Sequence, residues 1–174
     1  AVPQVRAKII EGVKEIVANY AVDGIHFDDY FYPTSETEYD KKSYDAYCKQ
    51  IEEGGSPLSL MDWRKTNINT LISGVYSAIK EINPNVVFGI SPQGNISNDN
   101  NMGADVATWG GKKGYVDYLC PQIYVNFDHP LLPFDDTIKQ WREMVSCEDI
   151  KLYAGIGVYK AGSDADDGTW KESN

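Results

Sequence analysis

Helical periodicity alternates with short apolar runs along most of this chain, and that alternation limits what the chain can fold into. Apolar residues recur at helical spacing over residues 5–20, 63–82 and 134–145, and shorter helices are expected near 44–51 and 104–109. Four short runs at 24–28, 86–91, 116–125 and 151–159 are predicted to be strands. They are apolar on both faces, which is typical of a parallel sheet covered by helices. The sequence therefore predicts an α/β fold.

Local signals give the boundaries of the long helices. Pro3 lies near the expected start of the first helix, Asp62 is the expected N-cap of the helix over 63–82, and Asn83-Pro84 is its expected end. The polar, tyrosine-rich segment 32–57 is expected to be a long excursion with a short helix inside it. Long ordered loops in compact domains usually carry function.

Size and charge exclude several classes of protein. The 174 residues suffice for one domain with a hydrophobic core. A net charge of −10 argues against a nucleic-acid surface, which would need a basic stripe. No apolar run approaches the roughly 18–20 residues that a membrane span needs. The 12 tyrosines and 4 tryptophans favour a neutral, hydroxyl-rich ligand instead.

Metal and redox chemistry have little support in the sequence. The three cysteines, Cys48, Cys120 and Cys147, show no CxxC spacing, and Cys120 is expected to be a small core residue. Only two histidines are present, His26 and His129, which disfavours a histidine-rich zinc site. We therefore expect no cofactor and no metal.

Polar side chains collect on one face of the predicted sheet. Side chains alternate along a strand, so Phe88 and Ile90 share one face of the second predicted strand. Ala154, Ile156 and Val158 share the corresponding face of the last predicted strand. The opposite face is small or polar, and His26 lies on it one layer below the strand end. At or near the four strand ends this face carries Asp28, Ser91, Gln122, Tyr124 and Tyr159. Ligands of parallel α/β sheets bind at the carboxyl ends of the strands, so this set predicts a pocket floor.

Each candidate residue has a functional and a structural interpretation. Asp28 is the candidate reactive carboxylate, which a closed barrel would partly desolvate, or else it caps the next turn together with Asp29. His26 is either a partner of Asp28 or substrate, or a satisfied interior histidine. The aromatic residues that follow either stack on a sugar ring or cover the rim. They are Tyr30, Phe31 and Tyr32. The loop acids Asp99, Asp105 and Asp128 are each either a second carboxylate or a solvated loop residue, and the second carboxylate otherwise lies outside these 174 residues.

Four stretches carry a family resemblance: VDGIHFDDYFYP, DWRKTNINTLISGVYSAIK, FGISPQG and YVDYLCPQIY. In this order, and over nearly the whole chain, they resemble the bacterial glycoside-hydrolase-like family 10, the group of the DUF187 domain. The resemblance implies a (β/α)₈ TIM barrel that hydrolyses glycans, including the glycan strands of peptidoglycan. It also implies an extracellular or cell-envelope location, as in secreted proteins and lipoproteins, with any signal or lipid anchor outside this chain.

Matched residue by residue, the family's HFDDY carboxylates fall on Asp28 and Asp29. The GISP block supplies Ser91, and the PQIY block supplies Gln122 and Tyr124. The chain departs from the pattern after ISP, where many members have Phe and Gly-Ile-Trp and this chain has Gln93 and GNISND. A different sugar subsite is expected there.

The matched strands correspond to the fourth through seventh of a barrel. A complete barrel needs about 250 residues, so residues 1–174 are expected to form a single partial-barrel domain. Such a piece would have unpaired strand edges, and we expect it to self-associate. The sequence leaves open whether this piece alone is active.

The leading hypothesis is a glycosidase that uses Asp28 and Asp29 as catalytic residues. Glycosidases normally use two carboxylates, whose separation determines inversion or retention. The expected substrate-binding residues are His26, Tyr30, Tyr32, Ser91, Gln93, Gln122, Tyr124 and Tyr159. The alternative is a non-catalytic glycan-binding barrel fragment. A metal-dependent polysaccharide deacetylase is disfavoured, because its His/Asp ligand set is not expected from two histidines that lie far apart in the sequence.

Overall fold

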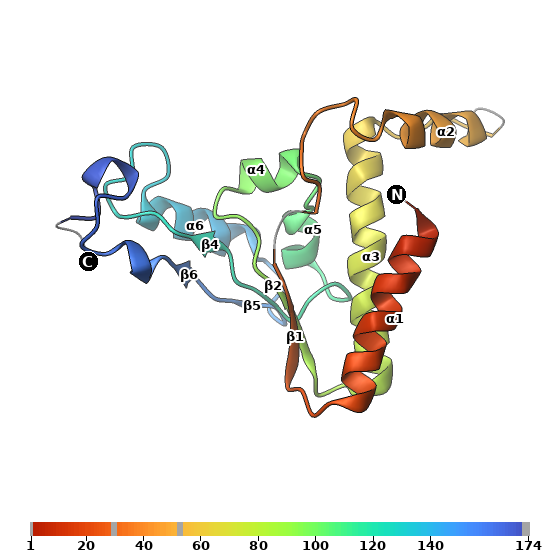
Figure 1. Cartoon of the computed structure of the whole chain (residues 1–174), viewed down its shortest axis with the longest axis horizontal. Helices are drawn as coiled ribbons and strands as arrows, with labels where there is room; N and C mark the ends of the chain where they lie inside the picture. The colour runs from red at the N-terminus through yellow and green to blue at the C-terminus, as the bar shows by residue number, and fades with distance from the viewer. Residues whose placement is uncertain (1, 29–30, 52–53, 172–174) are drawn as a thin grey trace.

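The computed structural model describes residues 2–28, 31–51 and 54–171. Within these ranges helices alternate with short strands, as Figure 1 shows. The elements in chain order are α1 (Pro3–Asn19), β1 (Gly24–Phe27), α2 (Lys41–Ile51), α3 (Leu60–Ile82), β2 (Val87–Ile90), α4 (Ile96–Asn101), α5 (Val106–Gly111), β3 (Tyr118–Leu119), β4 (Gln122–Ile123), α6 (Phe134–Met144), β5 (Lys151–Leu152), β6 (Gly155–Ile156), η1 (Val158–Lys160) and η2 (Asp166–Gly168). The predicted α/β class is confirmed.

The strands run parallel to one another. β1, β2, β3 and β5 pair in that order, and β4 pairs with β6. The predicted strand over 116–125 is two short strands, β3 and β4, in the structure. The break between them includes Pro121, which has no N–H to donate. The Pro121 carbonyl still accepts a hydrogen bond of 2.9 Å from the Gly155 N–H, so the neighbouring chain segments stay side by side across the break.

The last predicted strand is wrong at its carboxyl end. It was expected to continue to Tyr159, but β6 ends at Ile156, and residues 158–160 form the 3₁₀-helix η1. The Lys160 N–H donates to the Gly157 carbonyl over 2.9 Å and closes this turn. Tyr159 therefore lies beyond the sheet rather than on it.

Helix α3 forms the main apolar layer against the sheet. Ile72, Val75 and Ile79 are fully buried, and they join a core that includes Phe88 and Ile90 of β2. Helix α1 packs along α3 (Figure 1). At Gly74 a side-chain Cβ would come within 2.7 Å of a methyl carbon of Ile10, so glycine permits this close approach.

The start of α3 differs from the prediction. Its N-cap is Ser59, whose Oγ accepts a 3.1 Å hydrogen bond from the Asp62 N–H. The Ser59 hydroxyl donates in turn to Asp62 Oδ2 over 2.6 Å. Asp62 is therefore a residue of the first turn. The Ser-x-x-Asp spacing is a variant of the capping box, and it was the sequence signal for this boundary.

The loop that follows β2 contains a helix that the sequence analysis did not predict. α4 begins after Asn95, whose Oδ1 accepts from the Ser97 N–H over 2.9 Å and from the Asn98 N–H over 3.4 Å. Asparagine is among the best N-cap residues, because its short side chain reaches these free amides. The next helix, predicted at 104–109, is α5 at Val106–Gly111.

The two faces of the sheet separate as the alternation predicts, except on the last strand. Phe88, Ile90, Leu119 and Ile123 are at most 1% exposed and pack in the core. The expectation that Ile156 and Val158 also pack against helices is wrong, since they are 58% and 67% exposed. Helix α6 contacts β4, and within the described residues neither Ile156 nor Val158 joins the hydrophobic core.

None of the helices in the described ranges is both long enough and apolar enough to cross a membrane.

Candidate active site

The carboxyl ends of three strand segments bring Asp28, Ser91 and Gln122 together. Gln122 Nε2 donates to Asp28 Oδ1 over 2.5 Å and to the Ser91 carbonyl over 3.3 Å. The Ser91 hydroxyl donates to the Cys120 carbonyl over 2.9 Å. The parallel register makes this possible, because Ser91 N–H bonds to Phe27 on one side and Gln122 N–H bonds to Pro92 on the other. The result is a polar row across the sheet end.

Asp28 is exposed on the open face of the sheet. The desolvated setting expected for it inside a closed barrel is not observed in the described chain, since the face that carries it is uncovered there. Its carboxylate is nevertheless oriented by the Gln122 amide. An oriented carboxylate at the end of a parallel strand is suited to nucleophilic or acid–base chemistry.

His26 lies on the same face as Asp28, and its hydrogen-bond partner is Tyr118. His26 Nδ1 and the Tyr118 hydroxyl are 2.7 Å apart, and the two rings stack with centroids 5.8 Å apart. Partial burial raises the pKa of Tyr118 above its ordinary value. Gly89 makes the room for this pair, since a Cβ there would overlap the Tyr118 ring. This cluster supports the floor of the site.

Tyr124 and Tyr159 form an aromatic pair beyond the ends of β4 and β6. Their rings meet edge to face with centroids 6.4 Å apart. Tyr159 is 76% exposed, so one side of the pair is open to a ligand. Gly157 lies next to Tyr124, and a Cβ there would be 3.3 Å from the Tyr124 Cβ. An aromatic pair with one exposed ring, formed by a residue two positions from Gln122, is an arrangement suited to a sugar ring.

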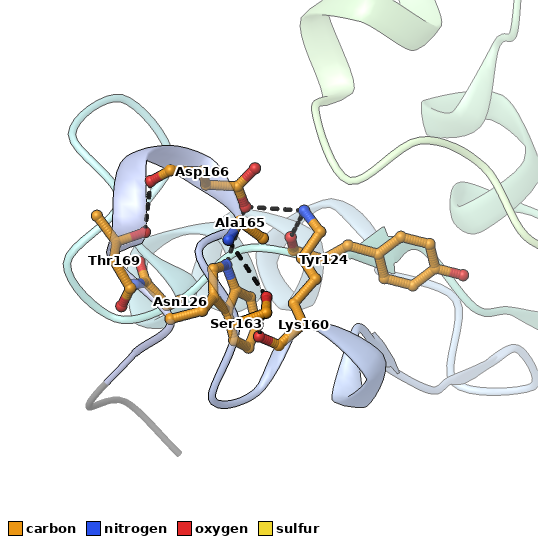
Figure 2. Close-up of polar contacts among 8 residues, drawn as sticks. Tyr124, Asn126, Lys160, Ser163, Ala165, Asp166 and Thr169 are labelled. Carbon is orange, nitrogen blue, oxygen red and sulfur yellow. Dashed lines mark hydrogen bonds and ion pairs between the residues drawn. The ribbon is translucent and has the colours of Figure 1, made fainter.

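Residues 158–171, which we call the C-terminal clasp, fold back onto the chain after β4 (Figure 2). Lys160 Nζ donates to the Tyr124 carbonyl over 2.9 Å and pairs with Asp166 Oδ2 at 2.8 Å. Trp170 Nε1 donates to the same Asp166 oxygen over 2.9 Å. Asn126 Nδ2 donates to the Thr169 carbonyl over 2.5 Å. These hydrogen bonds therefore hold the clasp, including Tyr159, against the residues that follow β4.

The electrostatics of the clasp follow from this geometry. Hydrogen bonds from Lys160 and then Trp170 lower the pKa of Asp166 below its ordinary value. Asp166 has a φ of 50°, in the left-handed region that non-glycine residues rarely adopt. Sequence analysis missed this cluster, because its contacts join the residues after β4 to residues 160–170, for which no element was predicted.

The aromatic residues after Asp28 contact the helices. Phe31 packs edge to face on Trp109 with centroids 5.2 Å apart, and the Arg64 guanidinium lies 5.0 Å from the centre of the Tyr32 ring. Burial and the nearby Asp40 carboxylate raise the pKa of Tyr32 to about 12. Tyr32 is thus placed against α3, and its role in sugar binding stays a prediction. Asp29 and Tyr30 lie outside the described residues.

Arg64 anchors the long segment after β1. It is 1% exposed and pairs with both carboxylate oxygens of Asp40, at 3.0 and 2.6 Å. It also donates to the carbonyls of Ser35 and Glu36, at 3.1 and 2.7 Å. This network holds the segment after β1 against α3. The only signal for it in the sequence was an arginine on the apolar face of a predicted helix.

The three loop acids have different surroundings. Asp99 is 2% exposed and its Oδ1 accepts from the Gln93 N–H over 3.1 Å. Asp105 Oδ2 accepts from Asn69 Nδ2 over 2.7 Å, which ties it to α3. Asp128 is exposed in the loop before α6. Of these acids, Asp128 is the one that the described geometry leaves at the surface.

Gln93 lies beside Gln122 through a parallel bridge, and the two residues line a cavity of about 240 Å³.

Among residues 2–28, 31–51 and 54–171, no three His, Cys, Asp or Glu side chains gather closely enough to hold a metal ion. The second histidine, His129, instead accepts from the Leu132 N–H over 3.0 Å in a turn. Cys120 is half-buried on the polar face, where burial raises the pKa of its thiol.

Comparison of the chain with known proteins shows which family it belongs to. The model of a family described as glycosyl hydrolase-like 10 matches residues 1–172. The chain is 36% identical over 178 residues to "Glycosyl hydrolase DigH" of Escherichia coli K12, covering 92% of this chain and 39% of that protein. It is 30% identical over 184 residues to "Glycosyl hydrolase YngK" of Bacillus subtilis 168, covering 95% of this chain and 35% of that protein. The chain thus spans under two fifths of these relatives, and it belongs to the glycosyl hydrolase-like 10 family.

Proposed function

We propose that this chain carries part of the active site of a glycoside hydrolase, with Asp28 as a catalytic carboxylate. The observation that supports this most is the Asp28 carboxylate held by Gln122 at the carboxyl end of a parallel sheet. Family membership and relatives named as glycosyl hydrolases point to the same chemistry. The proposed substrate is a polysaccharide or the glycan strand of peptidoglycan.

The proposed architecture is an arc of a (β/α)₈ barrel. Parallel strand order and helices between the strands support it, as does the polar face at the strand ends. In such a barrel the catalytic groups project from several strand ends on one side. Asp28, Ser91 and Gln122 have that placement. In the proposed barrel, the ends of the remaining strands would face these three residues. They would exclude water from the site and complete it.

Glycoside hydrolysis normally requires a second carboxylate. Asp99 and Asp105 each accept a hydrogen bond from a structural partner, Gln93 and Asn69. Asp128 is exposed in the loop after β4 and is the better candidate among the three. Asp29, adjacent to Asp28 in sequence, is the other candidate. Either would act as acid or base while Asp28 acts as the nucleophile.

The second candidate function is a glycan-binding module without turnover. The exposed Tyr159 ring beside Tyr124 favours it, because stacking on aromatic rings binds sugars without any reactive group. Under this proposal the aromatic pair carries the affinity. Asp28 would then contribute only a hydrogen bond.

The two proposals differ in the release of new reducing ends. The natural gene product that carries this chain, and the chain alone, would be incubated with peptidoglycan glycan strands and a panel of plant and host polysaccharides. Release of reducing ends supports the hydrolase. Binding of the same glycans, with no release by either protein, supports the binding module and contradicts the hydrolase.

A further inference from the structure

A cavity of about 240 Å³ adjoins the Asp28 site and has no assigned role. It lies between the residues that follow β2, strand β4 and helix α6. Its polar lining comes from Gln93, Asn95, Asn98, Gln122, Tyr124 and Thr137. We call it the amide pocket. Gln122 belongs to both sites, because its side chain donates to Asp28. Gln122 therefore connects the pocket to the candidate reactive carboxylate, which does not itself line the pocket.

The lining of the amide pocket contains no charged side chain among the described residues. Charged residues make up 24% of the whole chain, and none of them lines this pocket. Side-chain amides and hydroxyls both donate and accept hydrogen bonds. The volume is below the roughly 300–1,000 Å³ of drug-sized ligand sites. These properties fit one small, uncharged, hydroxyl-rich group.

The wall of the pocket is held from three directions. The Gln93 N–H donates to Asp99 Oδ1 over 3.1 Å, and the Gly94 carbonyl accepts from Trp141 Nε1 over 2.8 Å. A Cβ on Gly94 would lie 2.5 Å from the Gln122 carbonyl oxygen, so only glycine fits against β4 there. Because Asp99 and Trp141 are buried, the wall is positioned before a ligand arrives. Such preorganisation lowers the entropic cost of binding.

Thr137 supplies a second, independent observation. This residue of α6 is 2% exposed, and within the described residues its hydroxyl has no hydrogen-bond partner. Buried polar groups are almost always paired, and an unpaired one destabilises the fold. Since Thr137 lines the pocket, a small local adjustment would let a ligand hydroxyl pair with it. The unpaired hydroxyl thus points to a polar ligand.

We infer that the amide pocket is a subsite for an uncharged sugar residue of the substrate, next to the bond that is cleaved at Asp28. Gln93, Asn98 and Thr137 determine which residue it accepts. Gln93 and Asn98 lie in the stretch QGNISND, which follows β2. The inference rests on the proposed function for the position of the scissile bond.

The test is a binding titration that needs no turnover. Side-chain and backbone amide resonances of the chain would be followed while chitotetraose or cellotetraose, both uncharged, is added into the millimolar range. The fully deacetylated, cationic tetramer of glucosamine is the charged comparison. We expect an uncharged tetrasaccharide to shift the side-chain amide signals of Gln93 and Asn98. Tighter binding of the cationic tetramer, or no binding of either neutral one, would overturn the inference.

Matched variants locate the site. Gln93→Ala and Asn98→Ala should each weaken binding by roughly tenfold, the effect of losing one good hydrogen bond. Asn101→Ala removes an exposed asparagine from the same helix and should leave the affinity unchanged. Equal affinities for the Asn98 and Asn101 variants would show that the sugar binds elsewhere.

Thr137→Val separates a ligand contact from a structural role. The substitution removes the hydroxyl at nearly constant shape, so it should raise the melting temperature while weakening sugar binding. A variant that is more stable but binds as tightly as wild type would overturn the role of Thr137. Asp28→Asn should bind normally. If the wild-type protein binds sugar in the pocket but cleaves no glycan, the proposed hydrolase is contradicted and the subsite stands. If the wild-type protein cleaves glycans but its sugar binding is insensitive to Gln93 and Asn98, the subsite is contradicted and the hydrolase stands.

Discussion

The side-chain amide of Gln122 donates a 2.5 Å hydrogen bond to the carboxylate of Asp28, a residue 94 positions earlier in the chain. One strand, β2, lies between the segments that carry them. The bond therefore spans three strand ends, and Ser91 in the middle supplies a carbonyl to the same amide. A single side chain thus fixes the orientation of the candidate catalytic group relative to the sheet.

Replacing Gln122 by Ala should lower the rate of glycan hydrolysis by about tenfold to a hundredfold without unfolding the chain. The physical reason is lost orientation of Asp28, since a misplaced catalytic group costs rate without costing stability. The measurement is kcat and KM together with a thermal melt. Gln140→Ala, an exposed glutamine of α6, is the matched control. An unchanged kcat in the Gln122 variant would show that the hydrogen bond has no part in catalysis.

Replacing Asp40 by Ala should destabilise the fold by about 3 kcal/mol, because it leaves the Arg64 guanidinium buried without its carboxylate. Arg64 is 1% exposed and cannot regain water without moving the segment after β1. Asp45→Ala breaks an exposed pair with Lys41 and should change stability by less than about 1 kcal/mol. Urea unfolding of both variants measures the difference. Similar losses in the two would contradict an anchoring role for Arg64.

Tyr32 should make stability fall at alkaline pH. Its pKa is raised from an ordinary value of 10.0 to about 12 by burial and by Asp40, so the folded state favours the neutral phenol. That contribution is complete below pH 10 and is lost as the pH rises through about 12. Because the ring is only half-buried, solvent screening reduces the effect to about 1 kcal/mol.

Tyr32→Phe should remove this part of the pH dependence. The measurement is the free energy of unfolding between pH 9 and the alkaline limit, compared for wild type and Tyr32→Phe. Tyr39→Phe, which alters an exposed tyrosine of the same segment, is the control. Parallel curves for wild type and the Tyr32 variant would contradict the burial of the phenol.

Asp166→Asn should loosen the C-terminal clasp. The pKa of Asp166 is lowered by Lys160 and Trp170, so the contact is intact above the ordinary value of 3.8 and is lost as the pH falls below it. Hydrogen exchange at the Gly162 amide, which donates to the Trp170 carbonyl, reports the opening directly. We expect faster exchange in Asp166→Asn at neutral pH and in wild type only in acid.

The control for the clasp is Asp164→Asn, which breaks an exposed pair with Lys171. It should leave exchange at Gly162 unchanged. If both variants exchange alike, the Lys160–Asp166 pair does not hold the clasp. Weaker glycan binding in Asp166→Asn alone would further connect the clasp to the aromatic pair of Tyr124 and Tyr159.

The chain should self-associate in solution at high concentration. β1 and β5 are the outer strands of the four-stranded sheet in the described chain, and Ile156 and Val158 are 58% and 67% exposed. Unpaired edges and exposed apolar side chains favour association. Light scattering across a concentration series measures it, and Ile156→Lys should shift the distribution towards monomer. A concentration-independent monomer in wild type would contradict the expectation.

Much of the framework followed from local sequence patterns. The periods of apolar residues gave α1, α3, α6 and the strands, because burial against a sheet forces that spacing on any sequence. Alternation on adjacent strands also put Asp28, Ser91 and Gln122 at one edge. That inference needs only the parallel order of the strands, which short apolar runs separated by helices already imply.

What the sequence did not reveal depends on contacts between distant segments. The pairing of Arg64 with Asp40 and of Lys160 with Asp166 arises only when loops fold back on the sheet. The contact of the Tyr32 ring with Arg64 was likewise not visible in the sequence, because the two residues lie 32 positions apart. The exposure of Ile156 was missed for a related reason, since alternation gives the face of a strand but not whether anything covers it.

The central claim is that Asp28 is catalytic, and the most direct test is the rate of reducing-end release by Asp28→Asn relative to Asp23→Asn. Asp23 is an exposed aspartate at the other end of the same strand, so the pair controls for charge and for the fold. The natural gene product that carries this chain would be assayed on the best substrate of the panel. We predict that Asp28→Asn loses at least about a hundredfold in rate while Asp23→Asn keeps the wild-type rate. Equal rates for the two variants would contradict the claim.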